Sequence, residues 1–125
     1  MSFDRHAVVR VPFPFTDRTA AKNRPAVVLS DAGAFNTPAG HSVMAMITSD
    51  ANPAWPLDCS LRDLEAAGLP APSKVRFKLF TLDHRLVRGA IGKLSPADAE
   101  RVGAGLSQLL GDQKGHARPA RTGRR

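Results

Sequence analysis

The sequence predicts a mainly β fold, a small barrel or sandwich, that is followed by one C-terminal helix. Three observations support this fold class. The chain of 125 residues has the size of one domain. Short apolar runs alternate with polar residues between loops rich in glycine and proline, and the last apolar stretch has helical spacing. We therefore expect a single domain over residues 1–111 and a basic, disordered tail over residues 112–125.

The first predicted strand covers residues 7–15, where valine and phenylalanine recur at every second position. Pro12 and Pro14 both lack an N–H group, and residues two apart direct this group to the same side of a strand. That side of the strand should therefore be an edge or a mouth of the sheet.

The second and third strands are predicted as a hairpin. Residues 24–30 begin with Arg24 before a proline, a position that favours extended geometry. A loop over residues 31–40 then leads to an apolar, central strand over residues 42–48. Because the start of one antiparallel strand meets the end of the next, Arg24 and Thr48 should be neighbours.

The remaining elements follow from the same kinds of pattern. They are a short extended piece around Trp55, a helix of about two turns from Ser60 that ends at Gly68, strands over residues 74–82 and 86–94, and a helix that Ser95 caps and Gly111 ends. The strand over residues 74–82 carries a basic outer stripe. The apolar face of the final helix is predicted to consist of Val102, Leu106, Leu109 and Leu110.

Composition limits the classes of function. The 18 lysine and arginine residues exceed the 11 acidic residues, and this net charge of +7 favours a polyanionic partner or an acidic protein. The single cysteine, Cys59, excludes an intrachain disulfide and suits a reducing cytoplasm. No segment reaches the ~20 apolar residues of a membrane-spanning helix. The four histidines lack the spacing of metal ligands, so we expect no metal, no cofactor and no membrane association.

Cationic and hydroxyl side chains remain as candidates for chemistry. Together, such side chains can hold a phosphodiester through charge-assisted hydrogen bonds. The candidates are Arg24, Lys74, Arg76, Lys78, Thr48 and Ser49. RNA needs no metal for cleavage, since its own 2′-OH can attack phosphorus where a site stabilises the added charge. The same residues also fit a structural interpretation as a sheet edge, a turn and a solvated face.

Aromatic residues could stack on the bases of single-stranded RNA. The candidates are Phe13, Phe15, Trp55 and Phe77. We expect all four to fill the core instead.

Several segments share motifs with one known family. They are Val-Pro-Phe-Pro-Phe-Thr-Asp at 11–17, Lys-Asn-Arg-Pro-Ala-Val-Val-Leu-Ser at 22–30, Ile-Thr-Ser at 47–49, Pro-Ser-Lys-Val-Arg at 72–76, Thr-Leu-Asp at 81–83 and Ile-Gly-Lys-Leu-Ser at 91–95. In this order they resemble the PemK/MazF family of type II toxins. The resemblance spans residues 7–110. It implies an SH3-like β-barrel of the PemK/MazF/CcdB type and a homodimer. It also implies a ribosome-independent, sequence-selective endoribonuclease whose RNA cleavage is blocked by a cognate antitoxin.

The resemblance also implies roles for individual residues. Arg24 and Thr48 are the expected catalytic pair at the scissile phosphate. The expected substrate-binding residues are Arg76, Lys22, Ser49, Lys78 and Asp17.

The sequence departs from the family pattern at two places. His6-Ala7 stands where many members have Gly-Asp, and Lys78 stands where some relatives have a carboxylate. A general base from that strand is therefore not expected, which leaves His6, Asp17 or positioning alone to activate the 2′-OH. Two further functions stay open, a non-catalytic toxin that poisons gyrase and a nucleic-acid-binding module on the same barrel.

Overall fold

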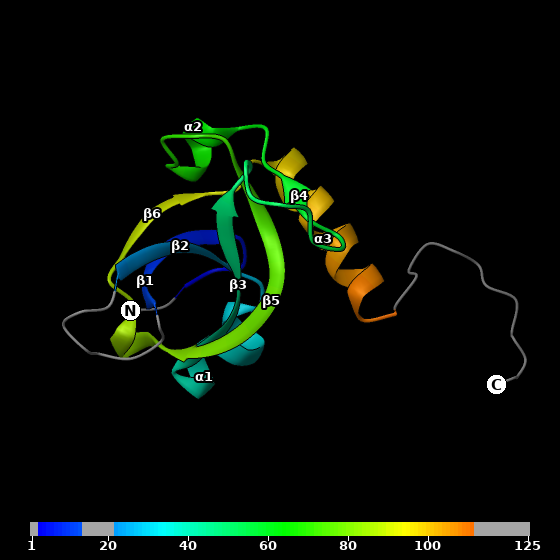
Figure 1. Ribbon diagram of the computed structural model, residues 1–125. Coiled ribbons are helices and arrows are strands. Elements are labelled where there is room, and N and C mark those ends of the chain that lie inside the picture. The colour runs from blue at the N-terminus through cyan, green and yellow to red at the C-terminus, as the bar shows by residue number, and fades with distance from the viewer. Residues whose placement is uncertain (1–2, 14–21, 112–125) are drawn as a thin grey trace, which may run out of the picture.

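The computed structural model describes residues 3–13 and 22–111. In this part of the chain, antiparallel strands form one six-stranded sheet in the order β4-β5-β3-β2-β1-β6. The sheet curves into a half-barrel, with helix α3 on its outer side (Figure 1). The strands are β1 (Ala7–Phe13), β2 (Lys22–Val28), β3 (His41–Ser49), β4 (Cys59–Ser60), β5 (Ser73–Asp83) and β6 (Gly89–Lys93). The predicted mainly β fold with a C-terminal helix is confirmed.

Strand β1 lies inside the sheet, between β2 and β6. Its pairing with β6 extends only from Ala7 to Arg10. Among the described residues, the β6 side of β1 therefore has no strand partner beside Pro12, where the sequence predicts an edge or a mouth of the sheet, although the Pro12 side chain itself is buried. Pro14 lies outside the described residues.

Strand β3 is central, as predicted, because it pairs with both β2 and β5. Its register with β5 shifts within one step. Ala45 lies opposite Leu79, whereas the next residue, Met46, lies opposite Arg76. The two intervening residues of β5 have no partner in the ladder, so β5 bulges beside Met46.

The bulge and local pairing change the predicted basic outer stripe on β5. Lys74 is buried, with 6% of its surface exposed. Leu79, expected on the apolar face, is instead 39% exposed. A strict alternation of the two faces is therefore wrong for this strand. Leu79 follows the extra residues that interrupt the period of two, and Lys74 is buried because its ammonium pairs with Asp58.

Helix α3 (Pro96–Leu109) begins as predicted, since the hydroxyl of Ser95 accepts a hydrogen bond from the backbone of the first turn. Val102 is buried in the core. Leu109 and Leu110, however, are 41% and 68% exposed, so their predicted place on the buried face is wrong. The reason is visible in Figure 1, where the C-terminal end of α3 extends beyond the sheet.

Helix α2 (Leu64–Ala67) is shorter than predicted. Its N-cap is Asp63, whereas Ser60 belongs to β4. Gly68 ends the helix with a φ of 74°, as expected. A Cβ atom at this glycine would lie 1.9 Å from the carbonyl oxygen of Ile91, so only glycine permits this packing of α2 on β6.

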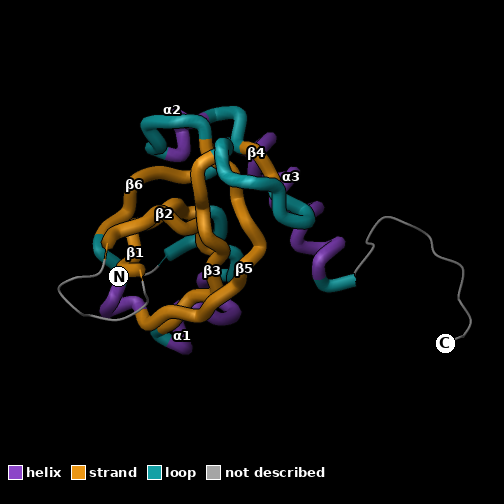
Figure 2. The backbone as a smooth tube through the Cα atoms, in the orientation of Figure 1, coloured by secondary structure: helices purple, strands orange, loops and turns teal. Residues whose placement is uncertain are grey.

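Other boundaries differ slightly from the predictions, as the tube in Figure 2 shows. The loop predicted over residues 31–40 contains a π-helical turn, η1 (Ala32–Asn36), and the short helix α1 (Thr37–Ala39). The strand predicted over residues 86–94 is shorter, because the 3-10 turn η2 (His84–Leu86) occupies its start.

The two faces of the curved sheet cover two hydrophobic clusters. The first includes Val27, Phe77 and Val102 and joins the sheet to α3. The second includes Val11 and Met44 and fills the other face. None of the helices in the described part of the chain has the length and apolar character needed to cross a bilayer.

Candidate active site

The register of β2 and β3 brings Arg24 and Thr48 to the same end of the sheet. Ala26 lies opposite Met46 in this antiparallel pair. Two residues further along the strands, this register places Arg24 opposite Thr48. Both residues line one pocket, which confirms that they are neighbours.

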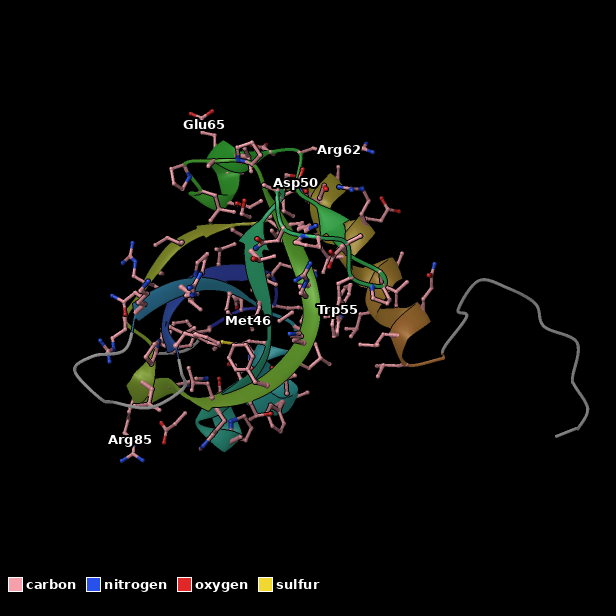
Figure 3. All side chains as sticks on the ribbon, viewed as in Figure 1. Met46, Asp50, Trp55, Arg62, Glu65 and Arg85 are labelled. Atoms are coloured by element: carbon pink, nitrogen blue, oxygen red, sulfur yellow. The ribbon has the colours of Figure 1, made fainter. Side chains whose placement is uncertain are left out.

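This pocket has a volume of about 170 Å³. Its lining consists of cationic, hydroxyl and apolar side chains, namely Phe13, Arg24, Met46, Ile47, Thr48, Arg76 and Lys78. Figure 3 labels Met46 of this set on β3. No carboxylate is among the described residues that line the pocket, so its electrostatic character suits an anion.

Arg24 is exposed and has freedom to bind a ligand. Its guanidinium carbon lies 5.5 Å from the centroid of the Phe13 ring. Among residues 3–13 and 22–111, no carboxylate forms an ion pair with Arg24. Its N–H groups are therefore available for the oxygen atoms of a phosphate.

Thr48 is oriented by a neighbouring amide. Nδ2 of Asn52 donates a hydrogen bond to Oγ1 of Thr48 at 2.5 Å. A hydroxyl group carries one donor and two acceptor lone pairs, so this bond uses an acceptor position. The O–H of Thr48 remains available to donate to an oxyanion.

Arg76 is held on one edge by the loop between β3 and β4. We call residues 52–58 of this loop the strap. Nε and Nη2 of Arg76 donate to the two carboxylate oxygens of Asp58 at 3.2 and 3.0 Å, and Nη2 also donates to the carbonyl oxygen of Pro53 at 2.6 Å. Among the described residues, Nη1 of Arg76 has no hydrogen-bond partner, so it can serve the pocket.

Asp58 also pairs with Lys74, whose Nζ lies 3.2 Å from Oδ2. Partial burial alone would raise the pKa of the Asp58 carboxyl, but hydrogen bonds from Arg76 and Lys74 outweigh it and lower the pKa below its ordinary value. Lys74 further donates to the carbonyl oxygen of Asn52 at 2.7 Å. Lys74 therefore fixes the strap and is not among the residues that line the pocket.

Comparison with known proteins identifies the family of the chain. Residues 4–110 match the family model of the PemK-like, MazF-like toxin of type II toxin-antitoxin system. The chain belongs to this family. No curated protein sequence matches the chain.

Solved structures of MazF proteins share the fold of this MazF-like toxin. A MazE–MazF complex from Deinococcus radiodurans is 25% identical with a TM-score of 0.70, and the match covers 89% of this chain and 98% of that chain. An endoribonuclease from a mycobacterial species is 16% identical with a TM-score of 0.69, over 89% of this chain and 93% of that chain. The SH3-like barrel of the PemK/MazF type is thereby confirmed as the fold.

The structure gathers only some of the predicted site residues of the toxin. Arg24, Thr48, Arg76 and Lys78 line the pocket, but Lys22 and Ser49 do not. Both of these residues are exposed, at the start of β2 and at the end of β3. Asp17 lies outside the described residues.

His6 is distant from the pocket. Its backbone N–H donates to the carbonyl oxygen of Val28, four residues along β2 from Arg24, a separation of about 13 Å in a strand. Burial, followed by the charge of Arg5, lowers the pKa of its imidazole. His6 therefore cannot act as the base within this pocket. Among the described residues, no group of three or more His, Cys, Asp or Glu side chains is arranged to hold a metal ion.

Sequence reasoning missed the strap residues Asn52 and Asp58. They hold Thr48 and Arg76, but each lies in a loop where polar residues are expected anyway. The one signal in the sequence that could have pointed to these two residues is Trp55, which lies between them.

The expectation that the aromatic residues fill the core is correct for Phe77 and wrong for two others. Phe77 is 6% exposed, whereas Phe13 and Trp55 are each 42% exposed. These two rings lie next to cationic side chains, Phe13 beside Arg24 and Trp55 beside Arg76 and Lys78. Phe15 lies outside the described residues.

Proposed function

We propose that this toxin is a metal-independent, sequence-selective endoribonuclease that cleaves single-stranded RNA in the cytoplasm. The observation that carries the proposal is a pocket that joins three cations to a hydroxyl group, with no carboxylate among the described residues that line it. A phosphodiester has the matching charge and acceptor oxygens. The family of MazF-like toxins supports the same activity.

Arg24 and Thr48 are the proposed catalytic residues. Arg24 binds the scissile phosphate and stabilises the negative charge that grows on the phosphorane. The free O–H of Thr48 donates to an oxygen of the same phosphate. Arg76, through Nη1, and Lys78 bind the substrate from the β5 side of the pocket.

The reaction needs no nucleophile from the protein. The 2′-oxygen attacks the adjacent phosphorus and loses its proton to water, and the bond between phosphorus and the 5′-oxygen breaks. The leaving 5′-oxygen takes up a proton from water. The products are a 2′,3′-cyclic phosphate and a free 5′-OH. Between substrate and products, the cations of the pocket stabilise the extra negative charge on the phosphorane. Lys22, Ser49 and Asp17 are proposed to contact RNA outside the described pocket.

The partners of the toxin are proposed to be a second copy of itself and a cognate antitoxin. The similarity to a solved MazE–MazF complex from Deinococcus radiodurans supports an antitoxin partner. A net charge of +7 favours an acidic segment that competes with RNA for the basic pocket.

Incubation of the purified protein with a long single-stranded RNA in EDTA tests the function. Discrete fragments that end in a cyclic phosphate are the expected result. Intact RNA together with inhibited gyrase supercoiling would establish the non-catalytic toxin instead. RNA binding with a steep salt dependence, and no cleavage at any time, would establish a binding module.

A further inference from the structure

The strap fixes the only tryptophan of the chain in place. The backbone N–H of Trp55 donates to Oδ2 of Asp58 at 3.0 Å, and the N–H of Asp58 returns a bond to the carbonyl of Trp55 at 3.0 Å. Asp58 in turn binds Arg76 and Lys74 of β5. Through Asp58, the backbone that carries the indole ring is therefore fixed to strand β5. Figure 3 shows Trp55 beside the ribbon of β5.

The ring of Trp55 remains partly open although cations lie over it. Nζ of Lys78 is 4.6 Å from the ring centroid and the guanidinium carbon of Arg76 is 5.7 Å away. Even so, 42% of the Trp55 surface is exposed. A large aromatic ring that is tied down and yet exposed next to a charged pocket is typical of a binding surface.

The two cations connect this ring to the pocket, since Arg76 and Lys78 also line it. A nucleotide offers a phosphate and a flat base a short distance apart. A phosphate between these two cations would therefore place its base within reach of the indole ring. Base stacking on an aromatic ring tolerates any sequence, because every base has a π face.

We propose that Trp55 is a stacking platform for the base next to the scissile phosphate of single-stranded RNA, and that the Asp58 contacts hold this platform in position. The proposal rests on the proposed function, since it assigns a base to the same bound RNA. The ammonium of Lys78 lies on a flexible stem and can move from the ring to the phosphate when RNA enters.

Tryptophan emission tests the proposal directly, because Trp55 is the only tryptophan. The probe is a random-sequence 2′-O-methyl RNA of about 12 nucleotides, in which the blocked 2′-oxygens prevent cleavage. Saturable quenching of the emission is expected at the RNA concentrations that raise the anisotropy of an end-labelled copy. Anisotropy without quenching would overturn the platform and leave RNA binding intact, whereas no anisotropy change would overturn both proposals.

A matched pair of variants separates stacking from bulk. Trp55→Phe keeps an aromatic face and should cleave RNA with nearly the wild-type KM. Trp55→Leu keeps apolar volume without a π face and should raise KM about tenfold, with a smaller change in kcat. Equal KM values for the two variants would overturn the proposal. An emission change that depends on protein concentration without RNA would assign the ring to a contact between two copies of this chain, and would also overturn it.

Discussion

Arg24 and Arg76 line the same pocket but are held in opposite ways. Arg24 is exposed beside Phe13 and, among the described residues, has no carboxylate partner. Arg76, in contrast, uses Nε and Nη2 of its guanidinium for hydrogen bonds to the Asp58 carboxylate and to a carbonyl oxygen of the strap. A cation held by hydrogen bonds, as Arg76 is, presents its charge from a fixed direction. We call these contacts of Arg76 with Asp58 and the strap the clamp. A cation without such contacts, as Arg24 is, can move with an oxyanion as the negative charge on that oxyanion grows. We infer that Arg76 orients the substrate and that Arg24 stabilises the transition state.

The largest effect is expected from Arg24→Ala. Removal of the cation that follows the developing charge should lower kcat/KM for RNA cleavage by about 100-fold or more. Arg24→Lys should recover only part of this loss, because an ammonium lacks the bidentate fork. The measurement is single-turnover cleavage of RNA, with circular dichroism as the check of folding.

Arg62→Ala is the matched control for this prediction. Arg62 is an exposed arginine that donates to the Asp98 carboxylate through its backbone N–H, and it is not among the residues that line the pocket. The control variant should cleave at the wild-type rate. An equal loss of kcat/KM in both variants would show that Arg24 contributes only to the net positive charge of the protein. It would then have no role distinct from that of Arg76.

Thr48→Val should have the next largest effect. Valine keeps the branched shape but removes the O–H that Asn52 leaves free for the phosphate. We expect kcat to fall about tenfold, the order of one charge-assisted hydrogen bond. Thr48→Ser, which retains the hydroxyl, should restore most of the activity. A serine variant as slow as the valine variant would show that the β-branched shape matters and the hydroxyl does not.

Asp58→Asn tests the clamped half of the comparison. The amide keeps the size of the side chain but leaves Lys74, whose side chain is 8% exposed, without its charge partner. The free energy of unfolding should fall by about 2–3 kcal/mol in urea denaturation. RNA cleavage should fall about fivefold, mainly through KM, because Arg76 loses its fixed direction.

The double variant Asp58→Asn with Lys74→Met separates the two effects of that change. Without a buried, unpaired ammonium, most of the stability should return. The KM should stay raised, since Arg76 still lacks its carboxylate. A KM that recovers together with stability would show that Asp58 supports folding alone and does not position Arg76.

Local patterns predicted the parts of the site that lie on regular strands. The proximity of Arg24 and Thr48 follows from two strand boundaries and an antiparallel register, and both are local properties. The burial of Lys74 was not predictable, since it depends on a carboxylate 16 positions earlier in the sequence, at Asp58. The bulge of β5 beside Met46 is similar, because no glycine or proline marks it.

The same reasoning explains the errors for the aromatic residues. Apolar character predicts burial on average, and Phe77 follows this rule. Trp55 departs from it because backbone and ion-pair contacts of the strap hold it at the surface. The ion pair between Asp58 and Arg76 joins residues 18 positions apart in the sequence, so only the folded structure could reveal it.

The smallest expected effect is a pH dependence of stability. It should involve His6 and leave the contacts between Asp58 and Arg76 unchanged. The pKa of His6 lies below 6.5 in the folded state, because of burial and then the charges of Arg5 and Lys93. The unfolded chain therefore binds its proton first as the pH falls. Stability is complete above pH 6.5 and declines as the pH drops through 6.5 towards the lower folded pKa. The pKa of His84 is lowered in the same direction, chiefly by burial.

The clamp should not respond over the same range. The pKa of Asp58 is lowered from 3.8, so its contribution is present above pH 3.8 and is lost only in stronger acid. Between pH 7.5 and 5.5 the melting temperature should therefore fall while the emission of Trp55 in the folded state stays constant. His6→Asn, with a residue that tolerates the positive φ at this position, should flatten the fall in melting temperature. An emission that shifts in parallel with the melting temperature would mean that the strap and the His6 end of the sheet are coupled, and that Arg76 is less rigidly held than its hydrogen bonds indicate.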